Sequence, residues 1–190
     1  MAQKKTALVL IDIQEDYFAG GAFALDPTQC ERAIATADGL LGAARASGAP
    51  IVHVRHENAA GGPPFLVEGT PGARFHPRVA PAPGEVVVTK RAPSSFVGTE
   101  LESVLRARGV ERIVVGGMIA WMCIDSTVRA AAERGFEVVL VAEMVASAAV
   151  SWRGRTVSAD DTLAAALAPL AFFSKEASVL EVERLLGGQV

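Results

Sequence analysis

The 190-residue chain contains only two cysteines, Cys30 and Cys123, and they form no C-x-x-C pair. A disulfide framework or a thiolate metal cluster is therefore not expected, and a reduced, cytoplasmic setting is the natural expectation. Long apolar runs are also missing, since no stretch approaches the roughly 20 residues that span a membrane. Residues 1–5 are polar and too short for a signal peptide, so no targeting segment is expected there.

The chain also lacks an excess of basic residues. Its 18 Lys and Arg residues against 21 Asp and Glu give a net charge of -3, which predicts neither a nucleic-acid partner nor an anionic membrane partner. Internal repeats and low-complexity segments are absent as well. With 51% hydrophobic and 21% charged residues, the composition is that of a globular protein of one domain's length.

Short apolar, β-branched segments recur along the chain and alternate with segments of helical period. This alternation predicts an α/β fold with a largely parallel sheet. The expected strands are residues 6–12, 50–55, 85–89, 113–115, 137–141 and 171–174. The expected helices are residues 27–48, 99–105, 122–135, 159–170 and 176–186. No G-x-G-x-x-G follows the first strand, so a dinucleotide-binding domain is disfavoured.

Two connections are long or polar enough to be noted. Residues 56–84 are rich in glycine and proline and show no clear period. A loop of this length in a compact domain is usually functional or contacts another subunit. Residues 151–155 are expected to form a polar loop.

Three residues that can carry chemistry fall at the ends of expected strands. Asp12 ends the first strand and Lys90 follows the third, while Cys123 begins the helix after residues 113–115. The carboxyl ends of parallel strands form the ligand crevice of an open α/β sheet. A thiol near a helix N-terminus is expected to ionise more readily than free cysteine, whose pKa is about 8.5.

Each of these residues has a simpler explanation when taken alone. Cys123 could be a small buried apolar residue, Asp12 a strand-end cap and Lys90 a solvated side chain. Their convergence at one edge of the predicted sheet favours a nucleophilic site over three unrelated roles.

The same residues lie in longer segments that resemble a known family. Residues 10–14, Lys90 with residues 95–101, and residues 116–135 around Cys123 are similar to the isochorismatase-like cysteine hydrolases. The resemblance covers nearly the whole chain. It implies that residues 1–190 form a single isochorismatase-like domain, a Rossmann-like three-layer α/β/α fold with a six-stranded, largely parallel sheet.

The resemblance also implies an Asp-Lys-Cys catalytic triad at Asp12, Lys90 and Cys123. Lys90 would stabilise the Cys123 thiolate, and Asp12 would accept the thiol proton and return it to the leaving group. The implied oxyanion hole is made of the backbone N–H groups of Ile119 and Cys123. A cis peptide bond between Met118 and Ile119 is implied with it, and no cofactor is implied.

The chain departs from the usual family pattern close to the nucleophile and after the fifth strand. Ala120 stands where threonine or serine is common, Trp121 where many members have histidine, and Glu143 where aspartate is common. Trp121 predicts a more apolar wall for the substrate pocket. Phe18 and Phe96 are candidate substrate-binding companions, although each could equally belong to the core.

The three histidines bear on metal binding, because nicotinamidases of this family hold a metal through an Asp-x-His segment and further histidines. That segment is absent here. His53 and His56 are three residues apart on a strand and are expected on opposite faces, and His76 lies in the long loop. No metal site is expected, and His53 is expected to be a half-buried strand residue.

These observations favour a metal-independent hydrolase that acts on a C–N bond of a small amide, ureide or carbamoyl compound. One alternative is a hydrolase of an isochorismate-type vinyl ether, although the members with that activity lack the cysteine. Another is a non-catalytic, thiol-bearing binding protein of the same fold. The expected partners are a small-molecule substrate and other copies of the chain, in a dimer or a larger homo-oligomer.

Overall fold

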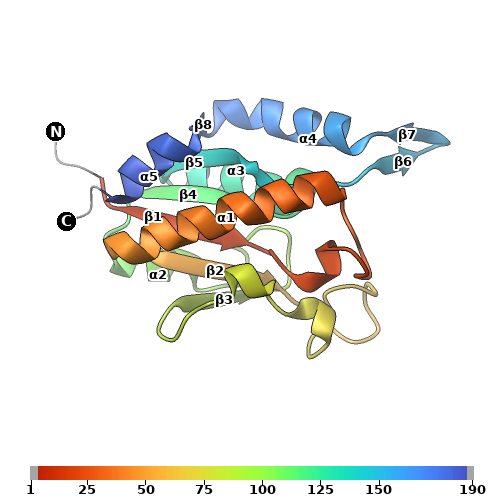
Figure 1. The fold of residues 1–190 in the computed structure, drawn as a ribbon, viewed down its shortest axis with the longest axis horizontal. Helices are drawn as coiled ribbons and strands as arrows, with labels where there is room; N and C mark the ends of the chain where they lie inside the picture. The colour runs from red at the N-terminus through yellow and green to blue at the C-terminus, as the bar shows by residue number, and fades with distance from the viewer. Residues whose placement is uncertain (1–3, 188–190) are drawn as a thin grey trace.

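A computed structural model describes residues 4–187 and shows a single six-stranded sheet through the centre of the molecule (Figure 1). All neighbouring strands of this sheet run parallel, in the order β3-β2-β1-β4-β5-β8. The strands are β1 (Thr6–Ile11), β2 (Ile51–His56), β3 (Val86–Lys90), β4 (Arg112–Gly117), β5 (Glu137–Val145) and β8 (Lys175–Glu176). The α/β class and the six-stranded parallel sheet predicted from the sequence are thus confirmed.

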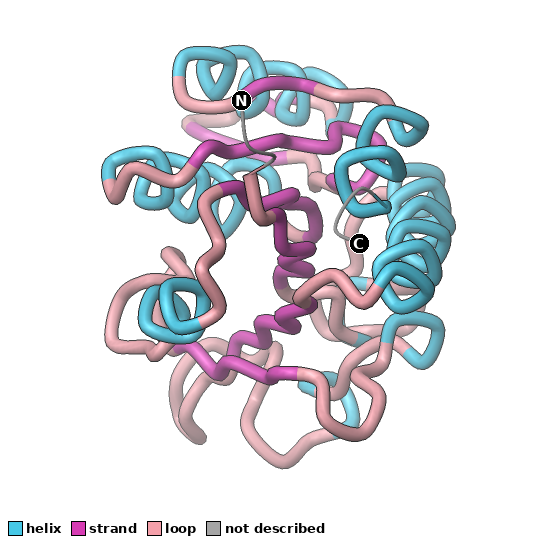
Figure 2. Tube along the Cα trace, turned by 90° about the vertical axis from the view of Figure 1, so that its left-hand side faces the viewer, coloured by secondary structure: helices cyan, strands magenta, loops and turns pink. Residues whose placement is uncertain are grey.

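Helices cover both faces of the sheet, which is seen nearly along its strands in Figure 2. On one face lie α1 (Pro27–Ser47) and α5 (Val179–Gly187), packed on alternate β1 residues such as Leu8 and Leu10. On the other face lie α2 (Leu101–Ala107), α3 (Asp125–Glu133) and α4 (Ala159–Leu167), whose apolar residues belong to the same hydrophobic cluster as Ala7, Val9 and Ile11. The central strands are therefore apolar on both faces, as in other buried parallel sheets.

Short helical turns connect these elements. They are η1 (Glu15–Tyr17), η2 (Pro71–Ala73), η3 (Pro77–Val79), η4 (Ala120–Ile124) and η5 (Ala168–Phe172). None of the helices within residues 4–187 is long and apolar enough to cross a membrane.

The ends of α1 follow from its sequence. The Asp26 carboxylate accepts a hydrogen bond from the Gln29 amide at 2.9 Å, and Pro27 occupies the first turn, where a missing N–H costs nothing. Gly48 ends the helix in the left-handed conformation, with φ of 69°.

Two predicted segments differ from the structure. The expected polar loop at residues 151–155 is part of an antiparallel hairpin, β6 (Val150–Trp152) and β7 (Arg155–Val157), which projects from the body in Figure 1. Its turn residues, Arg153 and Gly154, both have positive φ, as tight hairpin turns require. Both strands are only three residues long, and β7 is exposed throughout and β6 nearly so, which makes them hard to identify from the sequence.

The sixth strand also lies later than predicted. Residues 171–174 were expected to be extended, but the turn η5 continues to Phe172, whose side chain is exposed. The edge strand is instead the two-residue β8, which pairs with Val139 and Leu140 of β5. Because both β8 residues are charged and exposed, no hydrophobic pattern marks the strand.

The strand order determines where functional side chains can meet. From β1 the chain moves outward on one side through β2 and β3, and then crosses to β4 on the other side of β1. The carboxyl ends of β1 and β4 therefore form the topological switch point, where ligands bind in open α/β sheets.

Candidate active site

Asp12 directly follows β1 at this switch point and is fully buried. Its backbone is left-handed, with φ of 52°, a conformation that is strained for a residue other than glycine. The Asp12 amide donates to the Val54 carbonyl at 2.9 Å, which fixes this backbone against β2. The strain is thus held in place by the sheet at the residue that presents the carboxylate.

Lys90 ends β3, and its ammonium lies between the other two predicted triad members. The Lys90 Nζ is 2.7 Å from Asp12 Oδ2 and 3.2 Å from Cys123 Sγ, and the Lys90 side chain is buried. It also donates to the Ala92 carbonyl at 3.2 Å. The structure therefore brings together three residues that are far apart in the sequence.

Cys123 lies in η4, a single π-helical turn between β4 and α3. The sequence predicted that it would lie in the first turn of a regular α-helix, but α3 begins only at Asp125. In this wider turn, the Ile124 amide donates a hydrogen bond to the Ile119 carbonyl at 3.2 Å. π-turns of this kind are often found at functional sites.

A buried hydroxyl pair connects the loop after Lys90 to the helix after Cys123. The Thr127 hydroxyl accepts the Ser95 amide at 3.0 Å and lies 3.0 Å from the Ser95 hydroxyl. Both side chains are fully buried. This contact holds the lysine-bearing and cysteine-bearing segments together.

Two glycines allow β4 to approach its neighbours closely. A Cβ on Gly117 would lie 1.9 Å from the Ile11 carbonyl oxygen, and a Cβ on Gly116 would lie 2.3 Å from the Cβ of Met144. Gly117 also has a φ of 135°, which side-chain-bearing residues rarely adopt. Gly116 and Gly117 therefore allow the close approach of β4 to β5 and β1.

The backbone before Cys123 offers a donor for an oxyanion. The Met118–Ile119 peptide bond is cis. Among the hydrogen bonds of residues 4–187, none uses the amide N–H of Ile119, although this residue is buried. A free, fixed N–H four residues before the thiol is the type of group that stabilises a developing negative charge.

The pKa of Cys123 differs from the sequence-based expectation. Burial and the nearby Asp12 carboxylate together raise the pKa of Cys123 to about 12, because the opposing effect of Lys90 does not outweigh them. The expected ease of ionisation was therefore wrong, because loss of solvent and a nearby negative charge outweigh the helix terminus.

The other two triad members also have raised pKa values. Burial raises the pKa of Asp12 above its usual 3.8, against the lowering effect of Lys90. For Lys90, burial acts to lower the pKa, but Asp12 and Cys123 together hold it above its usual value. The resting site thus combines an ammonium, a carboxylate of increased basicity and a protonated thiol.

His56 is part of this cluster, although no role was predicted for it from the sequence. Its Nδ1 lies 3.0 Å from Lys90 Nζ and its Nε2 lies 3.0 Å from Asn58 Oδ1. The buried Gln14 side chain holds the His56 backbone in place. It accepts a hydrogen bond from the His56 amide at 2.8 Å and donates one to the His56 carbonyl at 2.9 Å. The position of His56 at the carboxyl end of β2 was the sequence signal that could have identified it.

The predicted substrate-binding residues lie in different surroundings. Trp121 is half-buried, and its indole Nε1 is buried without a hydrogen-bond partner in the part of the chain that the structure describes. The Phe18 ring packs on His76 with 4.3 Å between ring centroids. Phe96 is buried and packs on Phe136 and beneath Arg134, which are the contacts of a core residue.

The remaining histidine, His53, is more buried than predicted. Its side chain is only 1% exposed, and its Nε2 lies 2.8 Å from Glu85 Oε2. Glu85 also accepts two hydrogen bonds from Arg45. His53 therefore belongs to a structural cluster on the opposite face of β2 from His56.

One set of described side chains has the geometry of metal ligands. Single ligand atoms of Asp12, His56 and Cys123 all lie within 4.8 Å of one another. The Lys90 ammonium contacts all three residues, so a metal ion would have to displace a positive charge from the centre of the set. The donor set consequently fits an ammonium better than a metal ion.

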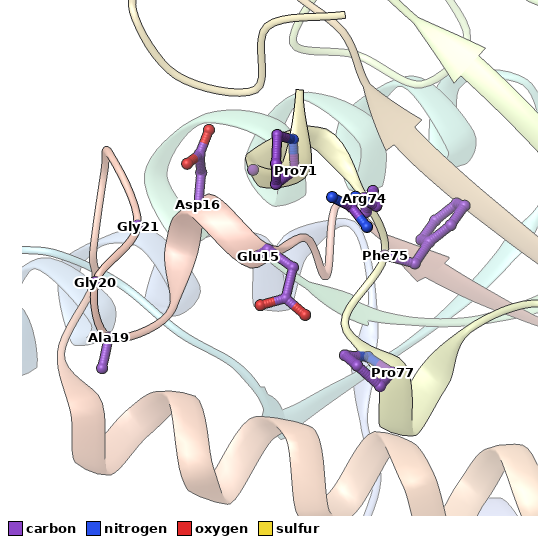
Figure 3. Close-up of a pocket in the computed structure, with 10 residues that line it drawn as sticks. Glu15, Asp16, Ala19, Gly20, Gly21, Pro71, Arg74, Phe75 and Pro77 are labelled. Atoms are coloured by element: carbon purple, nitrogen blue, oxygen red, sulfur yellow. The ribbon is translucent and has the colours of Figure 1, made fainter. Parts of the chain in front are cut away.

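An open cleft of about 560 Å³ lies beside the segment that follows Asp12 (Figure 3). Its walls come from residues 15–21 on one side and residues 71–77 on the other. No triad member is among its described lining residues. Glu15, Asp16 and Arg74 give the cleft a charged lining.

The chain is similar to known proteins over most of its length. Residues 6–162 match the family model of the Isochorismatase domain. The isochorismatase family protein YddQ of Bacillus subtilis is 39% identical over 165 residues, which are 87% of this chain and 91% of YddQ. The maleamate amidohydrolase of Pseudomonas putida is 36% identical over 155 residues, covering 75% of this chain and 72% of that enzyme.

A solved structure of a cysteine hydrolase from Pseudomonas syringae superposes with a TM-score of 0.90 at 25% identity. The alignment covers 99% of this chain and 95% of the chain in that structure.

Proposed function

The chain belongs to the isochorismatase family of hydrolases, and on that premise we propose that it cleaves a C–N bond of a small amide, ureide or carbamoyl compound through a thioester on Cys123. The observation that carries this proposal is the position of the Lys90 ammonium, 2.7 Å from the Asp12 carboxylate and 3.2 Å from the Cys123 sulfur. This arrangement supplies a nucleophile, a base and a fixed positive charge within one buried site.

In the first half of the proposed reaction, Asp12 takes the proton from the Cys123 thiol. The pKa values of both groups are raised, so the thiol does not ionise by itself near pH 7. The proton is therefore transferred to Asp12 as the sulfur attacks the substrate carbonyl. The sulfur then bonds to the substrate carbonyl carbon, and the oxyanion accepts a hydrogen bond from the Ile119 amide and the Cys123 amide. Collapse breaks the C–N bond, and Asp12 returns the proton to the departing nitrogen.

In the second half, water hydrolyses the thioester. Asp12 accepts a proton from the attacking water, the tetrahedral intermediate forms in the same oxyanion hole, and the carboxylic acid leaves. The sulfur regains its proton from Asp12. Lys90 keeps its charge throughout and stabilises the thiolate each time it appears.

The surroundings of Cys123 favour neutral, partly apolar substrates. Trp121 is two residues from the nucleophile, and we expect its ring to offer an apolar face to the substrate. A substrate carboxylate close to the thiol would compete with Asp12 for Lys90. The similarity to maleamate amidohydrolase supports an amide as the scissile group.

An ammonia-release screen over small amides, ureides and carbamoyl compounds tests the proposal. We expect turnover by the wild-type protein and by Cys30→Ala, and loss of turnover in Cys123→Ala. Each assay is repeated after exhaustive treatment with EDTA, which we expect to leave the rate unchanged because the triad requires no metal.

Three results would overturn the proposal. Turnover by Cys123→Ala would exclude the thioester route, and release of pyruvate from isochorismate without ammonia release from any amide would favour the vinyl ether alternative. A thiol that is alkylated but supports no turnover on the whole panel would favour a binding protein.

A further inference from the structure

His56 has a single hydrogen-bonding arrangement in the structure. The Asn58 amide group donates to the Phe65 carbonyl at 2.7 Å, so its oxygen faces His56 Nε2 at 3.0 Å. Nε2 must therefore carry the proton and donate it to Asn58. Nδ1 is left as an acceptor, and it faces the Lys90 ammonium at 3.0 Å.

The ring stays neutral near pH 7. Burial lowers the pKa of His56 and the charge of Lys90 lowers it further, and these two effects outweigh Asn58, Asp12 and the Ala92 backbone, which act to raise it. Among the described residues, the other titratable groups near the ring are Asp12 and Cys123, whose ligand atoms lie within 4.8 Å of it. A protonated ring would place a second positive charge against Lys90, so the neutral acceptor is the form that fits.

The Lys90 ammonium has three N–H donors, but its acceptors do not persist equally through the proposed reaction. Asp12 becomes protonated when it takes the thiol proton, and the Cys123 sulfur becomes a weak acceptor once it is acylated. The neutral acceptors, His56 Nδ1 at 3.0 Å and the Ala92 carbonyl at 3.2 Å, are the two that do not change.

We propose that His56 is a positioning residue, which holds the Lys90 ammonium in place through both halves of the reaction by accepting its N–H at Nδ1. This inference rests on the proposed function for its place in the reaction, and it adds a fourth side chain to the triad. Gln14 completes the arrangement, because its two hydrogen bonds to the His56 backbone fix the ring relative to the end of β1.

Three substitutions separate this role from packing. His56→Leu removes the acceptor while keeping side-chain volume. His56→Asn puts an amide oxygen where Nδ1 lies, and His56→Gln carries its amide group one bond further, where Nε2 lies. The matched control is His53→Leu, on the same strand, which removes a buried histidine from the Glu85 cluster on the opposite face.

We expect His56→Leu and His56→Gln to lower kcat about 10-fold to 100-fold with KM nearly unchanged, the scale of a lost hydrogen bond to a charged group. His56→Asn should restore most of kcat. His53→Leu should lower the thermal unfolding midpoint without lowering kcat. If the leucine variant does not fold, the Asn and Gln variants still test the positioning role of His56, because they differ only in where the acceptor lies.

A second measurement does not depend on the substrate. The rate at which iodoacetamide alkylates Cys123 at pH 8, in a Cys30→Ala background, should fall in His56→Leu and His56→Gln and recover in His56→Asn. These rates test the positioning role even if no amide is hydrolysed, in which case only the proposed function fails. Wild-type kcat and alkylation rates in folded His56→Leu or His56→Gln, or equal losses in the Asn and Gln variants, would overturn the inference.

Discussion

The chemistry of the site depends on the protonation states of three buried groups, Asp12, Lys90 and Cys123. Asp12 and Lys90 form an ion pair of 2.7 Å with no exposed surface, and Cys123 lies beside it at 3% exposure. Such burial favours neutral forms unless a partner compensates. Lys90 is paired with the Asp12 carboxylate and stays charged, whereas the thiol keeps its proton until, in the proposed reaction, Asp12 removes it.

Asp12→Asn should therefore change hydrolysis and thiol reactivity in opposite directions. Asp12 raises the pKa of Cys123, so its neutral replacement should lower that pKa and speed alkylation by iodoacetamide at pH 8. Hydrolysis should fall by about 10²-fold to 10⁴-fold, because the base and acid are lost.

The pH dependence of alkylation in wild-type protein provides the reference. Because the thiol pKa is raised to about 12, the rate at Cys123 should still be rising at pH 10. A plateau reached by pH 7, or slower alkylation in Asp12→Asn, would contradict this charge balance.

At the scale of elements, the sequence predicted the strands that build the site but not the turn that holds the nucleophile. The strands that lead to Asp12 and Lys90 are apolar segments that end at a charged residue. This pattern can be recognised in the sequence without knowledge of the tertiary structure. The π-turn of η4 has no such signal, because it results from the close approach of Gly117 to β1 and the contacts around Ile119. The role of His56 depends on the ring's distance from Lys90, which strand periodicity cannot supply.

Gly117→Ala should disrupt the junction between β4 and η4. The added Cβ would meet the Ile11 carbonyl oxygen, and the positive φ adds strain, so we expect the free energy of unfolding to fall by about 2 kcal/mol or more. Urea unfolding followed by circular dichroism measures the change.

Gly42→Ala is the matched control for this change. Gly42 is in the exposed interior of α1 with no atom within 4 Å of an added Cβ, so its replacement should stabilise the protein by about 0.5–1 kcal/mol. Equal effects of the two substitutions would show that Gly117 is not needed for close approach.

At the scale of the whole molecule, ionic clusters outside the site connect the elements of the fold. Glu85 joins Arg45 of α1 to His53 of β2, and Glu137 of β5 joins Lys4 to Arg112 of β4. Hydrogen bonds from Arg45 lower the pKa of Glu85 to about 2, and Lys4 and Arg112 do the same for Glu137. Burial lowers the pKa of His53.

Stability should therefore fall on acidification. A carboxylate with a depressed pKa stabilises the fold above about pH 4.5 and loses this contribution as the pH falls toward 2. His53 is buried in its neutral form, so its contribution to stability is lost as the pH falls below 6.5. Glu85→Gln should reduce the difference in unfolding free energy between pH 7 and pH 3 by on the order of 1–3 kcal/mol.

The control for this prediction is Glu100→Gln, at an exposed position without a side-chain cap. If Glu85→Gln and Glu100→Gln have the same pH dependence of unfolding as the wild-type protein, the Glu85 cluster does not contribute as described.

The strand pairings that the sequence did not predict lie where little surface is buried. The hairpin of β6 and β7 and the edge strand β8 are short and largely exposed, so burial of apolar side chains does not mark them in the sequence. The sheet interior, by contrast, is buried on both faces, and its apolar runs predicted both the fold class and the edge at which Asp12, Lys90 and Cys123 meet.

Partitioning of the intermediate between water and hydroxylamine is the measurement that tests the central claim most directly. A thioester on Cys123 should react with both, so hydrolysis of an amide substrate in the presence of hydroxylamine should yield the hydroxamate along with the acid. The hydroxamate fraction should rise with hydroxylamine concentration, and neither product should form with Cys123→Ala. Release of the acid alone at every hydroxylamine concentration, or continued turnover by Cys123→Ala, would contradict the account.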